Sequence, residues 1–125
     1  MAAVKISDCP SSPNCVSSIA QDQDHYVSPF HMDVAPDKAW EALKRAVEAE
    51  SRTRIVEEDR GRWYLRAEAT SRIFRFVDDL EFQIIPEEHL VHVRSASRVG
   101  YWDLGVNRRR VERLREALKS EGLWR

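Results

Sequence analysis

Apolar and polar residues alternate from Arg62 to Ser97, and this alternation constrains the fold more than any other feature. Side chains two positions apart point to the same face of a β-strand, so each segment of this kind has one apolar and one polar face. Turn-forming residues such as Gly61 and Pro86 separate the segments. The pattern predicts four consecutive antiparallel strands, at Arg52–Glu58, Arg62–Thr70, Ile73–Ile85 and His89–Ser97.

Two segments with helical spacing flank the strands. Pro36 suits a first helical position, and Trp40, Leu43 and Val47 recur on one face of a helix that should end near Glu50. A last helix is expected over Asn107–Glu121, with Gly122 as its C-terminal stop. Strands grouped between two helices predict an α+β fold, an antiparallel sheet of about four to five strands with both helices packed on one face.

The first 35 residues differ from the rest of the chain. Residues 7–18 are rich in Ser, Pro and Asn, which is typical of turns, and we expect an arm with few apolar contacts. Residues 25–34 contain apolar side chains that suit an edge strand interrupted by Pro29. We therefore expect an N-terminal arm and edge segment at 1–35 and an α+β unit at 36–125, forming one domain overall. Deletion of residues 1–18 should leave a folded domain.

The composition of the 125 residues narrows the functional classes. A hydrophobic fraction of 42% is enough for a packed core, and a net charge of −1 argues against a general nucleic-acid binder. There is no apolar run of 18 residues to span a membrane, so a soluble protein is expected, cytoplasmic if the N-terminus is native. Arginines number 16 against four lysines. Arginine recognises carboxylates and phosphates in a fixed two-pronged geometry, so this usage favours anion recognition, although genome composition explains it equally well.

The segment from Arg94 to Arg110 is the strongest candidate for a binding site. Three consecutive arginines at a helix N-terminus oppose the helix dipole, so they need an anion or carboxylate partners. One explanation is internal pairing, with Asp78, Asp79 and Arg110 as structural residues, since Asp78 falls on an otherwise apolar strand face. The other is a bound anion, and the expected ligand-binding residues are Arg94, Ser95, Ser97, Arg98, Asp103, Asn107, Arg108 and Arg109. Trp102 either seals this loop or lines a binding surface, and sealing is favoured because large aromatic side chains are mostly buried.

The two cysteines leave several chemistries open. Cys9 and Cys15 would form a disulfide in an oxidising compartment, whereas in the cytosol they would be reduced, redox-active or inert. A zinc site with His25 and His31 is possible in principle, but the spacing of the cysteines is wider than in structural zinc sites. Cys15 with His25 would be the corresponding nucleophile pair. We expect no metal site and no cofactor.

Three segments resemble a known family. They are the stretch from Cys9 to Ser18 (CPSSPNCVSS), the stretch from Phe76 to Phe82 (FVDDLEF), and the stretch from Arg94 to Arg110 (RSASRVGYWDLGVNRRR). These segments are similar to signatures of the domain of unknown function 1499 family, and Trp102 replaces the smaller residue expected at its position. The resemblance implies a fold shared with bacterial and plastid proteins that are often exported or membrane-tethered. It implies no activity.

Three functions from different classes therefore remain. The first is a non-catalytic binding module that recognises an anionic small molecule or an acidic protein surface through the arginine-rich segment. The alternative is a cysteine-dependent enzyme, although the sequence has no nucleophile elbow, phosphate-binding loop or metal motif. A purely structural partner subunit is a third possibility. We expect no nucleic-acid partner.

Overall fold

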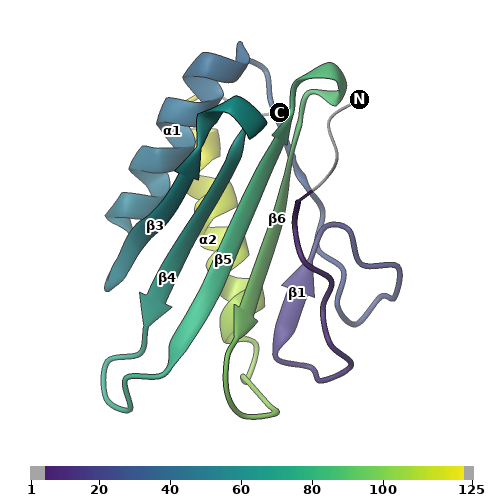
Figure 1. Cartoon of the computed structure of the whole chain (residues 1–125), viewed down its shortest axis with the longest axis vertical. Coiled ribbons are helices and arrows are strands. Elements are labelled where there is room, and N and C mark those ends of the chain that lie inside the picture. The colour runs from purple at the N-terminus through teal and green to yellow at the C-terminus, as the bar shows by residue number, and fades with distance from the viewer. Residues whose placement is uncertain (1–4, 123–125) are drawn as a thin grey trace.

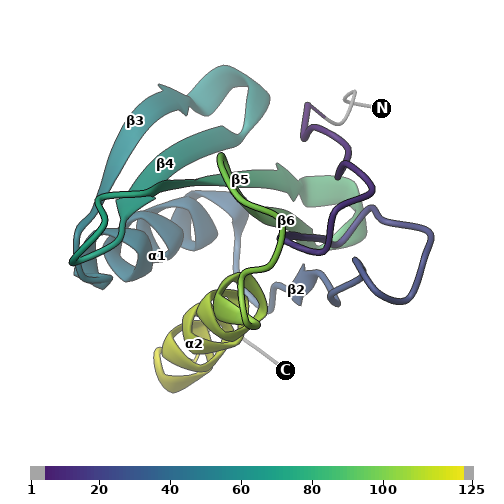
Figure 2. The same ribbon diagram turned by 90° about the horizontal axis from the view of Figure 1, so that it is seen from below.

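The computed structural model describes residues 5–122 and has two helices on one face of an antiparallel sheet (Figures 1 and 2). The strand order is β1-β6-β5-β4-β3, and the short β2 pairs with β6 as well. The α+β prediction is therefore confirmed. The strands are β1 (Cys15–Ser17), β2 (Phe30–His31), β3 (Thr53–Asp59), β4 (Tyr64–Thr70), β5 (Val77–Ile85) and β6 (Leu90–Ser97), and the helices are α1 (Pro36–Ala49) and α2 (Val106–Ser120).

The alternation in the sequence determines which side chains face the helices. On β4, Leu65 and Ala67 are fully buried in the core, whereas Arg66 lies on the opposite face. The register pairs Ala67 with Leu80 and Glu81 with Arg94, so like faces meet across neighbouring strands. The result is an apolar face that packs against α1 and α2 and an open face that is polar.

Helix α1 begins where the sequence indicates. Pro36 stands in its first turn with Asp37, where proline loses no hydrogen bond and a carboxylate is favoured by the helix dipole. Trp40 and Leu43 are almost completely buried, and the Trp40 ring meets the ring of Trp63 edge-to-face at 5.9 Å. Helix α1 therefore closes the core over the β3–β4 side of the sheet (Figure 2).

Strand β5 begins at Val77, so the prediction of a strand from Ile73 is wrong for residues 73–76. The amide of Ser71 donates to the Phe76 carbonyl (2.8 Å), and the amide of Phe76 donates to Ser71 Oγ (2.9 Å), which closes a turn. Arg75 takes a left-handed conformation within it (φ 58°). Phe74 and Phe76 would lie on the apolar face of the predicted Ile73–Ile85 strand, but in this turn they are exposed. Residues 73–76 alternate like a strand but form a loop, and their apolar side chains do not pack in the core.

The N-terminal segment contributes more to the core than its composition suggests. Strand β1 was not predicted, yet it pairs with β6 in antiparallel register, and Val16 belongs to the hydrophobic core. The predicted edge strand over residues 25–34 is reduced to β2, beginning directly after Pro29. Val27, Phe30 and Met32 around it are buried. The expectation of few apolar contacts in the arm is therefore wrong at β1, where a three-residue strand is too short to give a periodic signal.

Candidate functional site

The predicted segment contains a buried polar cluster at the start of α2. Arg110 Nη2 lies 2.9 Å from Asp78 Oδ2, and its Nη1 donates to Asn107 Oδ1 (2.8 Å) and Ser95 Oγ (3.1 Å). Both partners of the ion pair are largely buried, with side-chain exposures of 10% and 13%. Asn107 Nδ2 also donates to Ser97 Oγ (3.0 Å). These side chains join the core-facing side of β5 and β6 to the helix.

Asp103 occupies the N-terminal end of α2 with its own carboxylate. It accepts hydrogen bonds from the backbone N–H groups of Gly105 (2.9 Å) and Asn107 (3.1 Å) and from Asn107 Nδ2 (2.9 Å). Partial burial works to raise the pKa of Asp103, but the donors from Asn107 and Gly105 outweigh it and hold the pKa below its ordinary value. An external anion at this helix start would have to displace Asp103.

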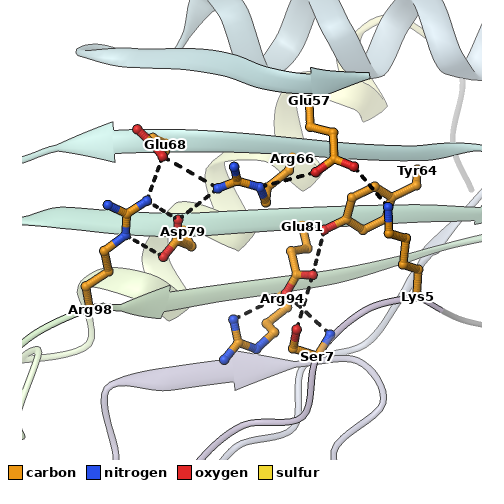
Figure 3. A network of polar contacts seen from close by, with 10 residues as sticks. All are labelled: Lys5, Ser7, Glu57, Tyr64, Arg66, Glu68, Asp79, Glu81, Arg94 and Arg98. Carbon is orange, nitrogen blue, oxygen red and sulfur yellow. Dashed lines mark hydrogen bonds and ion pairs between the residues drawn. The ribbon is translucent and has the colours of Figure 1, made fainter. Parts of the chain in front are cut away.

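The four arginines expected to share an anion do not converge. Arg94 and Arg98 lie on the open face of the sheet (Figure 3), whereas α2, with Arg108 and Arg109, lies on the other face. Arg108 donates to the carbonyls of Tyr26 (2.8 Å) and Asp24 (3.0 Å). Arg109 Nη1 donates to the Leu104 carbonyl (2.8 Å). The structure thus divides the predicted set between two sides of the molecule.

Arg98 and Arg66 belong to a network of ion pairs on the open face (Figure 3). Arg98 donates to Asp79 (2.8 Å) and to Glu68 (2.6 Å), and Arg66 lies 3.3 Å from Asp79 and 3.6 Å from Glu57. The hydrogen bonds to both carboxylates raise the pKa of Arg98. Asp79 therefore has a structural pairing role on this face, separate from that of Asp78.

Glu81 is the most buried charge on the open face, with an exposed fraction of 4%. It accepts from the Tyr64 hydroxyl (2.7 Å) and pairs with Arg94 (3.3 Å), and the Ser7 amide donates to it (3.4 Å) (Figure 3). Burial and the bond to Glu81 raise the pKa of Tyr64 well above its ordinary value. Arg94 Nη2 also donates to the Asp8 carbonyl (3.2 Å). This cluster holds the arm against the sheet.

Cys9 and Cys15 are joined in a disulfide. The loop that they close is held by His25, whose Nε2 lies 2.9 Å from the Ser12 carbonyl and whose Nδ1 lies 2.5 Å from Asp22 Oδ2. Acceptors at both ring nitrogens favour the charged form, so the Ser12 carbonyl and the Asp22 carboxylate raise the pKa of His25. Within residues 5–122, no group of three or more His, Cys, Asp or Glu is placed to hold a metal ion.

Two neighbouring loops expose large apolar side chains. The first is residues 71–76, between β4 and β5, and the second is residues 98–106, between β6 and the start of α2; we call them together the apolar loop end (Figure 1). Tyr26 is the one exposed large hydrophobic residue of the described chain outside it. Its members are Ile73, Phe74, Phe76, Val99, Tyr101, Trp102, Leu104 and Val106. Trp102 is 74% exposed, so the prediction that it seals the loop is wrong.

Local backbone geometry directs these side chains outward. Leu104 is left-handed (φ 55°) and 86% exposed, an unusual conformation for a bulky residue that costs about 1 kcal/mol or more. The rings of Phe74 and Phe76 stack at 5.6 Å, and those of Tyr101 and Trp102 meet edge-to-face at 5.1 Å. A cleft of about 350 Å³ separates the two loops, lined by Phe74, Phe76, Val99, Trp102, Leu104 and Val106 among others.

Hydrogen bonds to the N-terminal arm hold the second loop. Asn14 Nδ2 donates to the Gly100 carbonyl (2.8 Å), and the Asn14 carbonyl accepts from the Ser97 amide (3.0 Å). Asn14 is itself buried and lies next to Cys15 of the disulfide. The second loop of the apolar loop end is therefore anchored to the arm.

Unpaired positive charge surrounds the apolar side chains. In the described chain, Arg72 and Arg75 have no ion pair and no side-chain hydrogen bond. Arg109 bonds only to a backbone carbonyl, as does Arg52, whose Nε donates to the Thr70 carbonyl (3.1 Å). Arg52 and Arg72 line a second cleft of about 560 Å³ beside the first, and both clefts share Ser71, Asp78 and Val106.

The fold and this surface define a small α+β domain with a disulfide-closed arm and an exposed apolar end. The chain belongs to the family described as "Protein of unknown function (DUF1499)", whose model matches residues 5–118. The predicted family is therefore confirmed. No curated protein and no solved structure matches the chain. No helix in residues 5–122 is long and apolar enough to cross a membrane.

The apolar loop end could not be recognised from the sequence because its residues have patterns typical of buried positions. Phe74 and Phe76 alternate as in a strand, and a tryptophan is most often buried. Arg72 and Arg75, on either side of Ile73 and Phe74, were the sequence feature that could have indicated an exposed loop.

Proposed function

We propose that this protein is a non-catalytic binding module whose binding surface is the apolar loop end. The ligand or partner carries both apolar and anionic groups. One observation carries the proposal: nearly all the exposed large apolar side chains of the described chain are gathered in two adjacent loops. Contiguous apolar surface of this kind on a small protein marks a binding site.

The free energy available from this surface is considerable. Complete burial of one Leu, Ile or Phe side chain stabilises a complex by about 1.5–3 kcal/mol, so partial burial of several offsets the cost of association. Ile73, Phe74, Trp102 and Leu104 are each more than 70% exposed and thus have most of that area to lose.

The anionic part of the proposal rests on the unpaired arginines. Arg72 and Arg75 lie in the same loop as Ile73 and Phe74, and no carboxylate of the described chain neutralises them. Arg109, from the sequence-predicted set, lies at this end against Leu104 and has no carboxylate partner among the described residues, whereas Arg98 at the start of the second loop is paired with Asp79 and Glu68. Anion recognition is thus retained, but with Arg72 and Arg75 in place of Arg94 and Arg98.

The internal pairing of the other reactive groups supports a non-catalytic role. Glu81 and Asp78 each have a buried partner, and both cysteines are joined in the disulfide. No observation favours the thiol-dependent enzyme.

A titration of the ¹⁵N-labelled protein with dodecyl phosphate, kept below its micelle-forming concentration, tests this function. We expect saturable amide shifts at residues 71–76 and 98–106, and weaker shifts with inorganic phosphate or with dodecyl maltoside, which each supply half of the recognised chemistry. Leu104→Ser should weaken binding, whereas Tyr26→Ser, which removes an exposed aromatic elsewhere, should not. Absence of shifts in both loops, or equal shifts over the whole surface, would refute the proposal.

A further inference from the structure

The apolar loop end protrudes from the sheet. Both loops lie at the same end of the strands, opposite the β3–β4 and β5–β6 turns (Figure 1). The side chains of Leu104 (86% exposed) and Ile73 (79% exposed) project from the surface. The two loops also contain fewer residues than the roughly 20–30 a side of a standard protein interface. This shape suits insertion into a soft medium better than docking on a rigid surface.

The chemistry of the side chains also favours insertion into a soft medium. Trp and Tyr, here Trp102 and Tyr101, are enriched where an apolar phase meets water, because one part of the ring system is apolar and one atom can hydrogen-bond. Leu104, Ile73 and Phe74 have no polar group and would enter more deeply. Exposed aromatic and aliphatic side chains gathered at one end of a fold are typical of segments that lie at an interface between water and an apolar phase.

A comparison with the opposite end shows that the positive charge is specific to this one. At the β3–β4 turn, Arg60 lies 2.7 Å from Asp37 and Arg62 lies 3.8 Å from Asp59, so both arginines have carboxylate partners within the chain. Arg72 and Arg75, at the β4–β5 turn, have none among the described residues. The carboxylates nearby are already engaged, Asp78 with Arg110 and Asp103 with the start of α2.

We propose that the binding partner is the surface of an anionic lipid bilayer. The side chains of Ile73, Phe74, Tyr101, Trp102 and Leu104 insert at the level of the headgroups and upper acyl chains, and Arg72, Arg75 and Arg109 contact lipid phosphates and carboxylates. The strands then stand upright on the membrane, and the open face of the sheet stays in water. This inference rests on the proposed function, since it names the partner of the same surface.

Apolar insertion and charge act together in this arrangement. An arginine near an anionic leaflet contributes a free energy equivalent to about a fivefold change in affinity, and the effect is screened by salt. Loss of both Arg72 and Arg75 should therefore weaken binding roughly 25-fold. Binding through a few inserted side chains and screened charges is expected to be reversible.

Sedimentation with vesicles tests the proposal. The full chain is mixed with vesicles of phosphatidylcholine alone, or with about one third phosphatidylserine, a content that gives a strongly negative surface. We expect binding to the anionic vesicles, much weaker binding to the neutral ones, and release as salt is raised. Arg72→Gln with Arg75→Gln should reduce affinity about 25-fold, and Ile73→Ser with Leu104→Ser at least tenfold.

Matched variants separate the site from general charge and hydrophobicity. Arg60→Gln with Arg62→Gln makes the same change of charge at the opposite end, and Tyr26→Ser removes an exposed aromatic outside the loops; neither should alter binding by more than about twofold. Circular dichroism before sedimentation confirms that each variant is folded. Equal losses in the loop and control variants, or equal binding to neutral and anionic vesicles, would overturn the proposal.

Failure of the lipid inference can be distinguished from failure of the proposed function. If wild-type protein ignores both vesicles while dodecyl phosphate still shifts the amides of both loops, the lipid inference is overturned and the loops recognise an apolar and acidic protein surface. If neither probe acts on the loops, both proposals fail.

Discussion

Removal of the Asp78 carboxylate should destabilise the domain strongly. Asp78→Ala leaves the Arg110 guanidinium without its charged partner at a site where that side chain is only 10% exposed. Breaking a buried ion pair in this way typically costs 3–5 kcal/mol. Because Ser95 Oγ and Asn107 Oδ1 still accept from Arg110, we expect a loss toward the lower end of that range, about 3 kcal/mol.

Equilibrium urea unfolding, followed by circular dichroism, measures this loss. The total free energy of unfolding of a domain of this size is about 5–15 kcal/mol. The urea midpoint should therefore fall clearly, and the melting temperature should fall by about 10 °C. Asp37→Ala is the matched control, since it breaks the exposed pair with Arg60 and should cost at most about 1 kcal/mol.

A second substitution distinguishes an unpaired charge from a simple loss of packing. Adding Arg110→Met to Asp78→Ala removes the orphaned guanidinium, and should recover at least about 1 kcal/mol. If Asp78→Ala costs no more than Asp37→Ala, or if Arg110→Met only adds to the loss, the Asp78–Arg110 ion pair does not stabilise the fold in this way.

Three further perturbations test the supports of the apolar loop end. Cys9→Ser opens the disulfide and should lower the free energy of unfolding by about 2 kcal/mol, as should reductant on the wild type, measured by urea unfolding. His25 has a raised pKa in the folded state, so the stability it adds is complete below about pH 6.5 and is lost as pH rises through the folded pKa. The deficit of His25→Asn in unfolding free energy should therefore be larger at acidic than at alkaline pH; a constant deficit would refute the charged form. Asp103→Ala removes the acceptor at the start of α2 and should lower the free energy of unfolding by about 1–2 kcal/mol, measured by thermal melts. An unchanged stability would show that water replaces the carboxylate.

The elements with a clear period could be predicted from the sequence. Trp40 and Leu43 identify the buried face of α1, and the alternation from Tyr64 to Thr70 identifies both faces of β4. The position of Asp78 on the apolar face of β5 predicted an arginine partner, and the structure places it beside Arg110. These inferences succeed because periodicity and the cost of an unpaired buried charge are local or chemical constraints.

The candidate surface could not be predicted, because it depends on where the chain departs from its local pattern. Residues 73–76 continue the alternation of β5, but the left-handed Arg75 and the turn closed by Ser71 take them out of the sheet. The arginines of β6 and α2 are adjacent in sequence, yet Arg94 and Arg98 project from the opposite side of the sheet to that covered by α2. Only the three-dimensional pairing shows which arginines are left without a carboxylate.

In both proposals the apolar loop end is the part of the molecule that contacts the binding partner. Paramagnetic broadening of amide resonances, with anionic bicelles that contain lipids spin-labelled in the acyl chain, tests this claim most directly, since it reports which residues approach the bilayer interior. We expect strong broadening confined to residues 73–76 and 99–106, and none on the open face around Glu81 and Arg94. Broadening centred on that open face, or spread evenly over the protein, would contradict it.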